Sequence, residues 1–287
     1  MTDGFVVVDK PVGWTSHDAV ARCRKVFGQK RVGHAGTLDP DATGVLLVGL
    51  GRATRLLKYV GDLEKAYVGE VVLGAATSTL DASGDVTASW DMSSVTIDDV
   101  RAAATKFVGD IEQIPPMVSA VQIGGQRLHA LARKGVEVER APRPVTVHSL
   151  DVTGSPEPGV FTVDVVCSTG TYVRTLAADI GAALDGGAHL RNLRRRAVGT
   201  FTSEHATPLE DLTPEAARPA VQLLAHLPSV TVDDASVEAI SHGKPLLGEI
   251  STVAVETVAV LDASGELVAV YRRDGDKYVA DVVLLGS

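Results

Sequence analysis

Short apolar runs and segments of helical spacing alternate along the chain, which predicts a mixture of strands and helices. Buried or partly alternating strands are expected at residues 5–8, 45–48, 64–74 and 161–167. Helices are expected at residues 16–28, with Ser16 as the N-cap, and at 52–60, 97–108 and 175–180. Further strands, at residues 255–261, 267–271 and 278–284, indicate a small β domain at the C-terminal end.

One loop stands out between the first helix and the strand at 45–48. Residues 33–44 place glycines and Pro40 around the carboxylate of Asp39. Glycine admits conformations closed to other residues, and the proline keeps Asp39 extended rather than helical. Such a loop holds a side chain in a fixed position. Local chemistry alone favours an Asp that caps its own turn, so the residues leave both interpretations open.

Two other side chains also have open interpretations. Arg174 lies near the start of the helix expected at 175–180, where a positive charge opposes the helix dipole. An anionic partner would explain it, and Asp39 is the candidate, although the residues alone do not decide this pairing. Tyr67 is either a core aromatic of its strand or a platform that stacks on a nucleobase.

Residues 113–147 differ in composition from the segments around them. They combine prolines, the pair Gly124–Gly125 and several basic residues. We expect an ordered insertion that closes over a ligand, or alternatively a structural brace. Residues 208–228 contain several prolines and are expected to form a linker or a structural brace. The chain is therefore divided into a large domain, residues 1–228, and a small β domain, residues 229–287.

The net charge of −9 is unevenly distributed. Residues 1–204 carry a net charge of −1, whereas residues 205–287 carry −8. Basic clusters lie at residues 19–38 and 189–196 within the nearly neutral part. Such clusters bind phosphate along selected faces, or they are ordinary solvated side chains.

Composition excludes several classes of protein. The apolar fraction of 45% is ample for a packed core. Cys23 and Cys167 are isolated and the histidines form no i, i+4 pair, which argues against a disulfide framework and a zinc site. The N-terminal residues do not resemble a signal peptide, and no apolar run reaches the length of a membrane span. A soluble, cytoplasmic protein is expected.

Several short motifs, in order, resemble those of the TruB family of bacterial tRNA pseudouridine synthases over most of residues 5–204. Two of them are Val-Asp-Lys-Pro-Val-Gly-Trp-Thr-Ser at 8–16 and the loop at 33–44. The others are Lys-Ala-Tyr at 65–67, Gln-Ile-Pro-Pro-Met at 113–117, Arg-Pro-Val at 143–145, Gly-Thr-Tyr-Val-Arg at 170–174 and Leu-Arg-Arg at 193–195. Each motif alone is weak, but their joint occurrence is highly specific.

The resemblance implies an α/β mixed-sheet catalytic domain followed by a small all-β, PUA-like RNA-binding domain. It implies an isomerase that flips out uridine 55 of the tRNA T loop and converts it to pseudouridine. The implied partner is the tRNA T stem-loop. The resemblance implies no cofactor, no metal, no membrane and no obligatory protein partner, and it implies a monomer. Assistance in tRNA folding can coexist with this activity.

The resemblance also assigns roles to residues. Asp39 is implied as the catalytic carboxylate, and Arg174 pairs with it and keeps it ionised. Tyr67 is implied to stack on the uracil and to take part in the later removal of a proton. The remaining site residues implied are Tyr172 and Leu193, as walls of the base pocket, and His34, which fills the space that the flipped nucleotide leaves.

The chain departs from the family pattern at two positions, and two other functions remain as alternatives. Residues 113–147 correspond to a segment that clamps the stem-loop, and here Gln122 and His129 replace an expected lysine and tyrosine. A protein that only binds or folds RNA would use the same surface without chemistry. A nucleoside or glycoside hydrolase is a third hypothesis, but it would need a second working carboxylate, and Asp41 is too close to Asp39 in sequence to be assumed.

Overall fold

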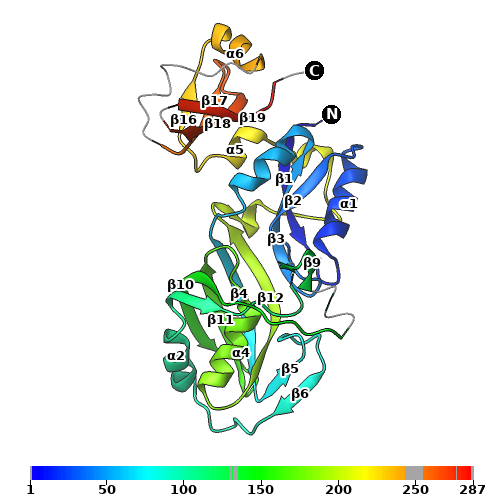
Figure 1. Ribbon diagram of the computed structural model, residues 1–287. Coiled ribbons are helices and arrows are strands. Elements are labelled where there is room, and N and C mark those ends of the chain that lie inside the picture. The colour runs from blue at the N-terminus through cyan, green and yellow to red at the C-terminus, as the bar shows by residue number, and fades with distance from the viewer. Residues whose placement is uncertain are drawn as a thin grey trace.

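The computed structural model describes residues 2–119, 121–128, 131, 135–242, 255–275 and 277–285. It confirms the expected mixed α/β fold, with one large mixed sheet and a second, small sheet near the C-terminus (Figure 1). The large sheet has the order β14-β1-β3-β12-β4-β11-β10-β7, and β2, β13 and β15 pair beside this path. Its strands are β1 Gly4–Lys10, β2 Val32–Ala35, β3 Thr43–Leu50, β4 Lys65–Leu73, β7 Gly109–Gln113, β10 Arg143–Gly154, β11 Val160–Cys167, β12 Ala188–Val198, β13 Phe201–Thr202, β14 Thr207–Pro208 and β15 Arg218–Pro219.

The strand β12 joins the two halves of the large sheet. It runs parallel to β3, with Arg194 opposite Thr43, and antiparallel to β4, with Arg195 opposite Tyr67. Figure 1 shows β1 to β3 on one side of this strand and β11 and β10 on the other. The pairing of β12 with β4 shifts register twice, and such irregularities bend a strand and re-aim its side chains. The candidate site lies at this junction.

Helices cover the two halves separately. The helix α1, Ser16–Val26, packs on β1 and β3, and η1, Gly51–Tyr59, lies against the same strands. The helices α2, Ile97–Thr105, and α4, Val173–Ala183, share a core with β4, β10, β11 and β12. Strand β3 is buried along nearly its whole length. This explains the unbroken apolar run at 45–48, because a strand covered on both faces has no polar side.

The start of α1 corrects one expectation. The N-cap is Thr15 rather than Ser16: the Thr15 side chain accepts a hydrogen bond from the Asp18 amide, and the Asp18 carboxylate accepts one from the Thr15 amide. This reciprocal arrangement satisfies two donors at the helix start, which a cap at Ser16 would leave unpaired. Ser16 is buried and binds the loop that carries Asp39 instead.

The remaining predicted elements are present with shifted ends. The expected helix at 52–60 is the 3-10 helix η1, and the expected helix at 97–108 ends three residues earlier. The insertion at 113–147 begins at the end of β7 and finishes inside β10, and these two strands pair with Gln113 opposite Arg143. Between them lies a short hairpin of β8, Gln122–Ile123, and β9, Gln126–Arg127. His129 lies outside the described residues.

Smaller elements accompany the large sheet. The strands β5, Ala75–Thr77, and β6, Val86–Ser89, form a separate hairpin that leads the chain past the end of α4. Short turns of helix lie at η2, Ser203–His205, η3, Pro214–Ala216, and α5, Ala220–Leu223. No helix in the described ranges is long and apolar enough to cross a membrane.

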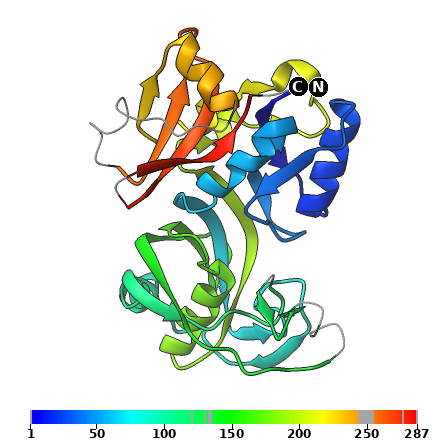
Figure 2. The same cartoon turned by 45° about the horizontal axis from the view of Figure 1, so that its top comes forward.

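The expected C-terminal strands form a sheet of their own, in the order β16-β17-β18-β19. These strands are Ser229–Thr231, Thr257–Leu261, Leu267–Asp274 and Lys277–Val283, and one helix, α6, Asp234–Ser241, accompanies them. Figure 2 shows this unit against the N-terminal part of the chain. Apolar residues of β18 and β19 share a core with β1, β3 and η1, so the unit is docked on the large sheet.

Candidate active site

The loop between β2 and β3 carries Asp39 and is held from several directions. The Ser16 hydroxyl accepts from the Leu38 amide at 2.9 Å and donates to the Leu38 carbonyl at 3.1 Å. On the other side of Asp39, the Pro40 carbonyl accepts from Lys10 Nζ at 3.2 Å and from the Gly13 amide at 2.9 Å. The residues before and after Asp39 are therefore both fixed, which aims the carboxylate.

Arg174 lies between two carboxylates. Its Nη2 is 3.0 Å from Asp39 Oδ2, and its Nη1 is 3.2 Å from Asp81 Oδ2. The first contact confirms the expected pairing of Arg174 with Asp39. The sequence did not single out Asp81 as a site residue, because nothing local distinguishes it from other loop aspartates. The turn between β5 and β6 brings it to the start of α4.

The guanidinium of Arg174 is held almost completely by the protein. Nη1 also donates to the Thr79 carbonyl at 3.0 Å, and Nη2 donates to the Val118 carbonyl at 2.8 Å. The side chain is only 6% exposed, whereas that of Asp39 is 41% exposed. Arg174 is therefore a fixed cation at the base of the site, and Asp39 projects from it towards open space.

The pKa of Asp39 is raised from its usual value. Burial of the carboxyl group is the main cause, and the charges of Asp81 and Asp41 act in the same direction. The guanidinium of Arg174 opposes the shift. Without Arg174, Asp39 would be protonated over a wider range of pH, so the guanidinium favours the ionised carboxylate.

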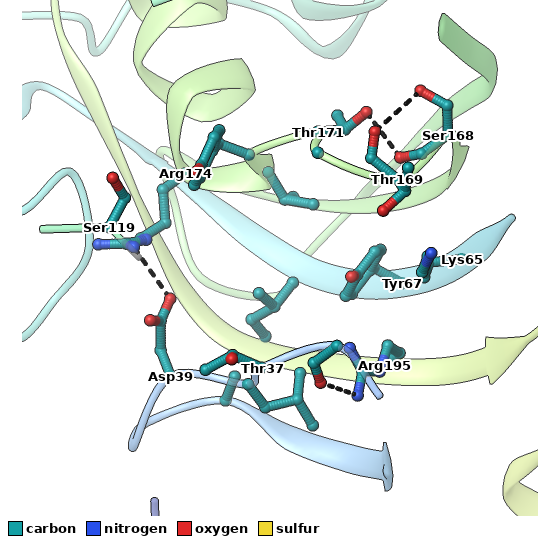
Figure 3. A pocket seen from close by; sticks show the side chains of 17 residues that line it. Thr37, Asp39, Lys65, Tyr67, Ser119, Ser168, Thr169, Thr171, Arg174 and Arg195 are labelled. Carbon is teal, nitrogen blue, oxygen red and sulfur yellow. Dashed lines mark hydrogen bonds and ion pairs between the residues drawn. The ribbon is translucent and has the colours of Figure 1, made fainter. Parts of the chain in front are cut away.

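A pocket of about 270 Å³ opens beside Asp39. Figure 3 shows Asp39 and Arg174 at one end and Tyr67, Lys65 and Arg195 towards the other. The residues that line the pocket are Gly36 to Asp39, Ala42, Lys65, Tyr67, Ser119, Ser168 to Arg174, Leu193 and Arg195. Four expected site residues, Tyr67, Tyr172, Arg174 and Leu193, thus meet around Asp39. An aromatic ring, an aliphatic side chain and several hydroxyl groups suit a planar polar base.

His34 has a different position from the other expected residues. It lies on β2 outside the pocket lining, and its ring meets that of His17 at a centroid distance of 5.5 Å. Its Nδ1 is buried and has no hydrogen-bond partner among the described residues. Burial lowers the pKa of His34 to about 4, and the charges of His17 and Arg195 act in the same direction. His34 is therefore neutral at physiological pH.

The sequence left open whether the basic cluster at 189–196 binds phosphate or is an ordinary solvated set of side chains. Its partly exposed and exposed arginines pair with protein carboxylates: Arg191 with Glu70 and Glu157, Arg194 with Asp9, and Arg196 with Asp164. Arg195 is buried and lines the pocket. Arg195 and Lys65 both belong to sequence motifs named above, but the sequence did not indicate a role for either.

Within the described ranges, no group of three or more His, Cys, Asp or Glu side chains is arranged to hold a metal ion. Cys23 and Cys167 are both buried and unlinked. Burial raises the pKa of the Cys23 thiol to about 12 and that of Cys167 to about 11, so neither is an activated nucleophile. The charged and polar groups that the site offers are the Asp39 carboxylate, the fixed guanidinium groups of Arg174 and Arg195, the Lys65 ammonium and the partly buried phenol of Tyr67.

Comparisons with known proteins agree with this geometry. Residues 24–173 match the family model "TruB family pseudouridylate synthase (N terminal domain)", and residues 174–227 match "tRNA pseudouridylate synthase B C-terminal domain". A tRNA pseudouridine synthase B of Rhodococcus jostii is 47% identical over 95% of this chain and 90% of its own length. A protein of the same name from Symbiobacterium thermophilum is 50% identical over 84% of this chain and 82% of its own length.

Solved structures give the same result for the fold. A chain in an H/ACA RNP bound to a substrate RNA containing 2′-deoxyuridine aligns with a TM-score of 0.74 and 25% identity, covering 99% of this chain and 85% of that one. A chain of a Cbf5-Nop10-Gar1 complex aligns with a TM-score of 0.73 and 29% identity, covering 97% of this chain and 83% of that one. The two family models together span most of the chain, and they meet at Arg174, inside the site itself. This chain therefore belongs to the TruB family of pseudouridylate synthases.

Proposed function

We propose that this enzyme converts uridine 55 in the T loop of tRNA to pseudouridine, with Asp39 as the catalytic carboxylate. The observation that carries the proposal is the contact of 3.0 Å between Asp39 and the buried Arg174, at the edge of a pocket lined by Tyr67. The curated relatives at 47% and 50% identity are tRNA pseudouridine synthases, which supports tRNA as the substrate.

The reaction breaks the bond between uracil N1 and ribose C1′, turns the base and joins C5 to C1′. Three routes use Asp39: attack on C1′, attack on C6 of the ring, and formation of a glycal. Each of them needs an ionised carboxylate that is fixed relative to the nucleotide, and Arg174 supplies both conditions. The isomerisation conserves all atoms of the uridine, so the proposal invokes no cofactor and no metal.

The target base must leave its stack to reach Asp39, which costs a few kcal/mol. In the pocket, the ring of Tyr67 stacks on the flipped uracil, and Tyr172 and Leu193 form the remaining walls. His34, neutral and close to the loop of Asp39, fills the space that the nucleotide leaves in the RNA. Residues 113–147 close over the stem-loop, and the enzyme acts as a monomer without a protein partner.

The test uses a T stem-loop RNA with uridine at the target position and purified protein in the presence of a chelator. Pseudouridine is scored by carbodiimide labelling and primer extension. Modification at that one uridine is expected with the wild type and not with Asp39→Asn, which should still bind the RNA. Asp41→Asn is the matched control, since Asp41 lies on the same loop, and it should retain activity.

Other outcomes would decide against the proposal. Tight binding without modification would indicate a protein that acts on RNA folding alone. Release of free uracil would indicate a hydrolase. Modification of a different uridine would keep the chemistry and reject the T loop as the target.

A further inference from the structure

We propose that Arg195 is a positioning residue for this reaction, which stabilises Tyr67 during the interval in which the tyrosine has given up its hydroxyl proton. The inference rests on the proposed function, in which Tyr67 takes part in the removal of the proton from C5 of the base. It concerns a residue that no motif interpretation had assigned.

Arg195 is a buried cation without a carboxylate partner among the described residues. The side chain is 1% exposed, and within the described part of the chain no carboxylate lies within ion-pairing distance of it. The other arginines of the same strand, Arg191, Arg194 and Arg196, are more exposed than Arg195, and each has a carboxylate partner. A buried charge is costly unless it is compensated, so a buried arginine without a carboxylate requires an explanation.

Arg195 binds the backbone at both ends of the loop that carries Asp39. Its Nε donates to the Val45 carbonyl at 2.7 Å, and its Nη2 donates to the Gly36 carbonyl at 3.0 Å. These two carbonyls lie on either side of the loop that carries Asp39. A Cβ at Gly36 would lie 3.3 Å from Nη1, so the guanidinium is packed directly against the loop backbone. Arg195 thus fixes both ends of the loop through two charge-assisted hydrogen bonds.

Arg195 also lies beside Tyr67 in the pocket. Arg195 on β12 is the direct cross-strand neighbour of Tyr67 on β4. The two side chains therefore lie on the same face of the sheet, and both line the pocket (Figure 3). Burial raises the pKa of Tyr67, and Arg195 opposes this rise. The other titratable groups that act on the pair are Lys65, Cys167, Asp39, His34 and Lys10.

The chemistry explains why an uncompensated cation is useful here. In the isomerisation, uracil N1 gains one proton and C5 loses one. When the N1–C1′ bond breaks, its electron pair stays on N1, and the Tyr67 hydroxyl gives N1 its proton. After C5 has joined C1′, the Tyr67 oxygen takes the C5 proton, and the electron pair of the C5–H bond restores the ring double bond. Between these two transfers Tyr67 is an anion.

A phenolate at this position is stabilised by the adjacent guanidinium. A carboxylate beside Arg195 would cancel that effect in advance, because the cation would already be neutralised. The lack of a carboxylate within the described residues therefore fits a site where negative charge appears only during the reaction.

The test measures single-turnover formation of pseudouridine on a T stem-loop RNA with hydrogen or deuterium at C5 of the target uridine. For Arg195→Gln we expect a rate that falls by roughly 10²-fold and a deuterium isotope effect larger than that of the wild type. The rate of this variant should also rise with pH more steeply than that of the wild type, because hydroxide then assists ionisation of Tyr67. Arg194→Gln, on the same strand, is the matched control and should leave the isotope effect unchanged.

Arg195→Lys keeps the charge and covers the case in which Arg195→Gln does not fold, as judged by circular dichroism. It should give a smaller loss of rate, with an isotope effect above that of the wild type. A loss of rate with an unchanged isotope effect in the folded variants would overturn the inference and leave Arg195 as a support for the loop only. Absence of pseudouridine with the wild type would instead reject the proposed function, so the two failures are distinguishable.

Discussion

Ser16 and Leu38 exchange two hydrogen bonds through a single hydroxyl group. The Ser16 oxygen accepts from the Leu38 amide and donates to the Leu38 carbonyl, and Ser16 itself is 2% exposed. These bonds connect the first turn of α1 to the residue immediately before Asp39. The position of the loop that carries Asp39 is thus set by a helix that contributes no side chain to the pocket lining.

Ser16→Ala should lower both stability and activity. The substitution leaves the amide and carbonyl of Leu38 buried without their partner, which costs about 1–3 kcal/mol in free energy of unfolding. The loop should also become less well fixed, so the single-turnover rate should fall. Urea unfolding and pseudouridine formation measure the two effects, with Ser93→Ala, an exposed serine, as the control. Unchanged values for both would contradict the role of this contact.

Asp81→Asn tests the second carboxylate of Arg174. Asn keeps an oxygen for the turn, where Asp81 Oδ1 accepts from Ser83, but it removes the charge that holds Nη1. We expect the single-turnover rate to fall by roughly 10- to 100-fold, because Arg174 is then held less firmly against Asp39. The acid limb of the pH profile should move to lower pH, since Asp81 raises the pKa of Asp39.

The control for Asp81→Asn is Asp85→Asn, because Asp85 is an exposed aspartate of the same hairpin region. Its rate and pH profile should match those of the wild type. If Asp81→Asn shifted the acid limb to higher pH, the assigned electrostatic effect of Asp81 on Asp39 would have the wrong sign.

The sequence offered Asp39 and Arg174 as candidates, and the family resemblance added their pairing and the pocket residues Tyr67, Tyr172 and Leu193, but neither predicted a role for Asp81 or Arg195. Asp39 could be singled out because glycine and proline leave a local signature, and Arg174 because a cation at a helix start is out of place. Asp81 carries no such signature. Its contact with Arg174 depends on how the β5–β6 hairpin meets α4, and the pattern Thr-Ser-Thr-Leu-Asp resembles many solvent-exposed turns.

Arg195 was missed for a different reason. Along a regular strand, side chains alternate between faces, so the cluster at 189–196 could have been sorted into inner and outer arginines. In β12 the register shifts between Arg191 and Arg194 and again between Arg195 and Ala197, and Asn192 has a φ of 52°. These irregularities break the period of two. Composition alone therefore indicated one basic stripe where the fold has three surface ion-pairing arginines and one buried cation.

Asp281→Ala tests how the C-terminal unit is attached. The Asp281 carboxylate accepts from Lys58 Nζ and from the Tyr59 hydroxyl, both at 2.6 Å, and thus joins β19 to η1. The loss of both contacts should lower the free energy of unfolding by about 1 kcal/mol, because the pair is partly exposed. The single-turnover rate should stay unchanged, as none of these residues lines the pocket beside Asp39. Asp274→Ala, an exposed residue of β18, is the control for urea unfolding.

His34 makes stability depend on pH in a predictable direction. Its pKa is lowered from 6.5 to about 4, so between these values the unfolded state binds more protons than the folded state. Stability should therefore be full above pH 6.5 and fall as the pH drops towards 4, by at most about 1.4 kcal/mol per pH unit from this group. His34→Gln should make stability depend less on pH in this range. The pKa of His226 is lowered in the same direction, so His226→Gln should give a separate reduction of the same kind. Urea unfolding at pH 7 and pH 5 measures the difference, and an unaltered slope in His34→Gln would mean that His34 is protonated as readily in the folded protein as in the unfolded chain.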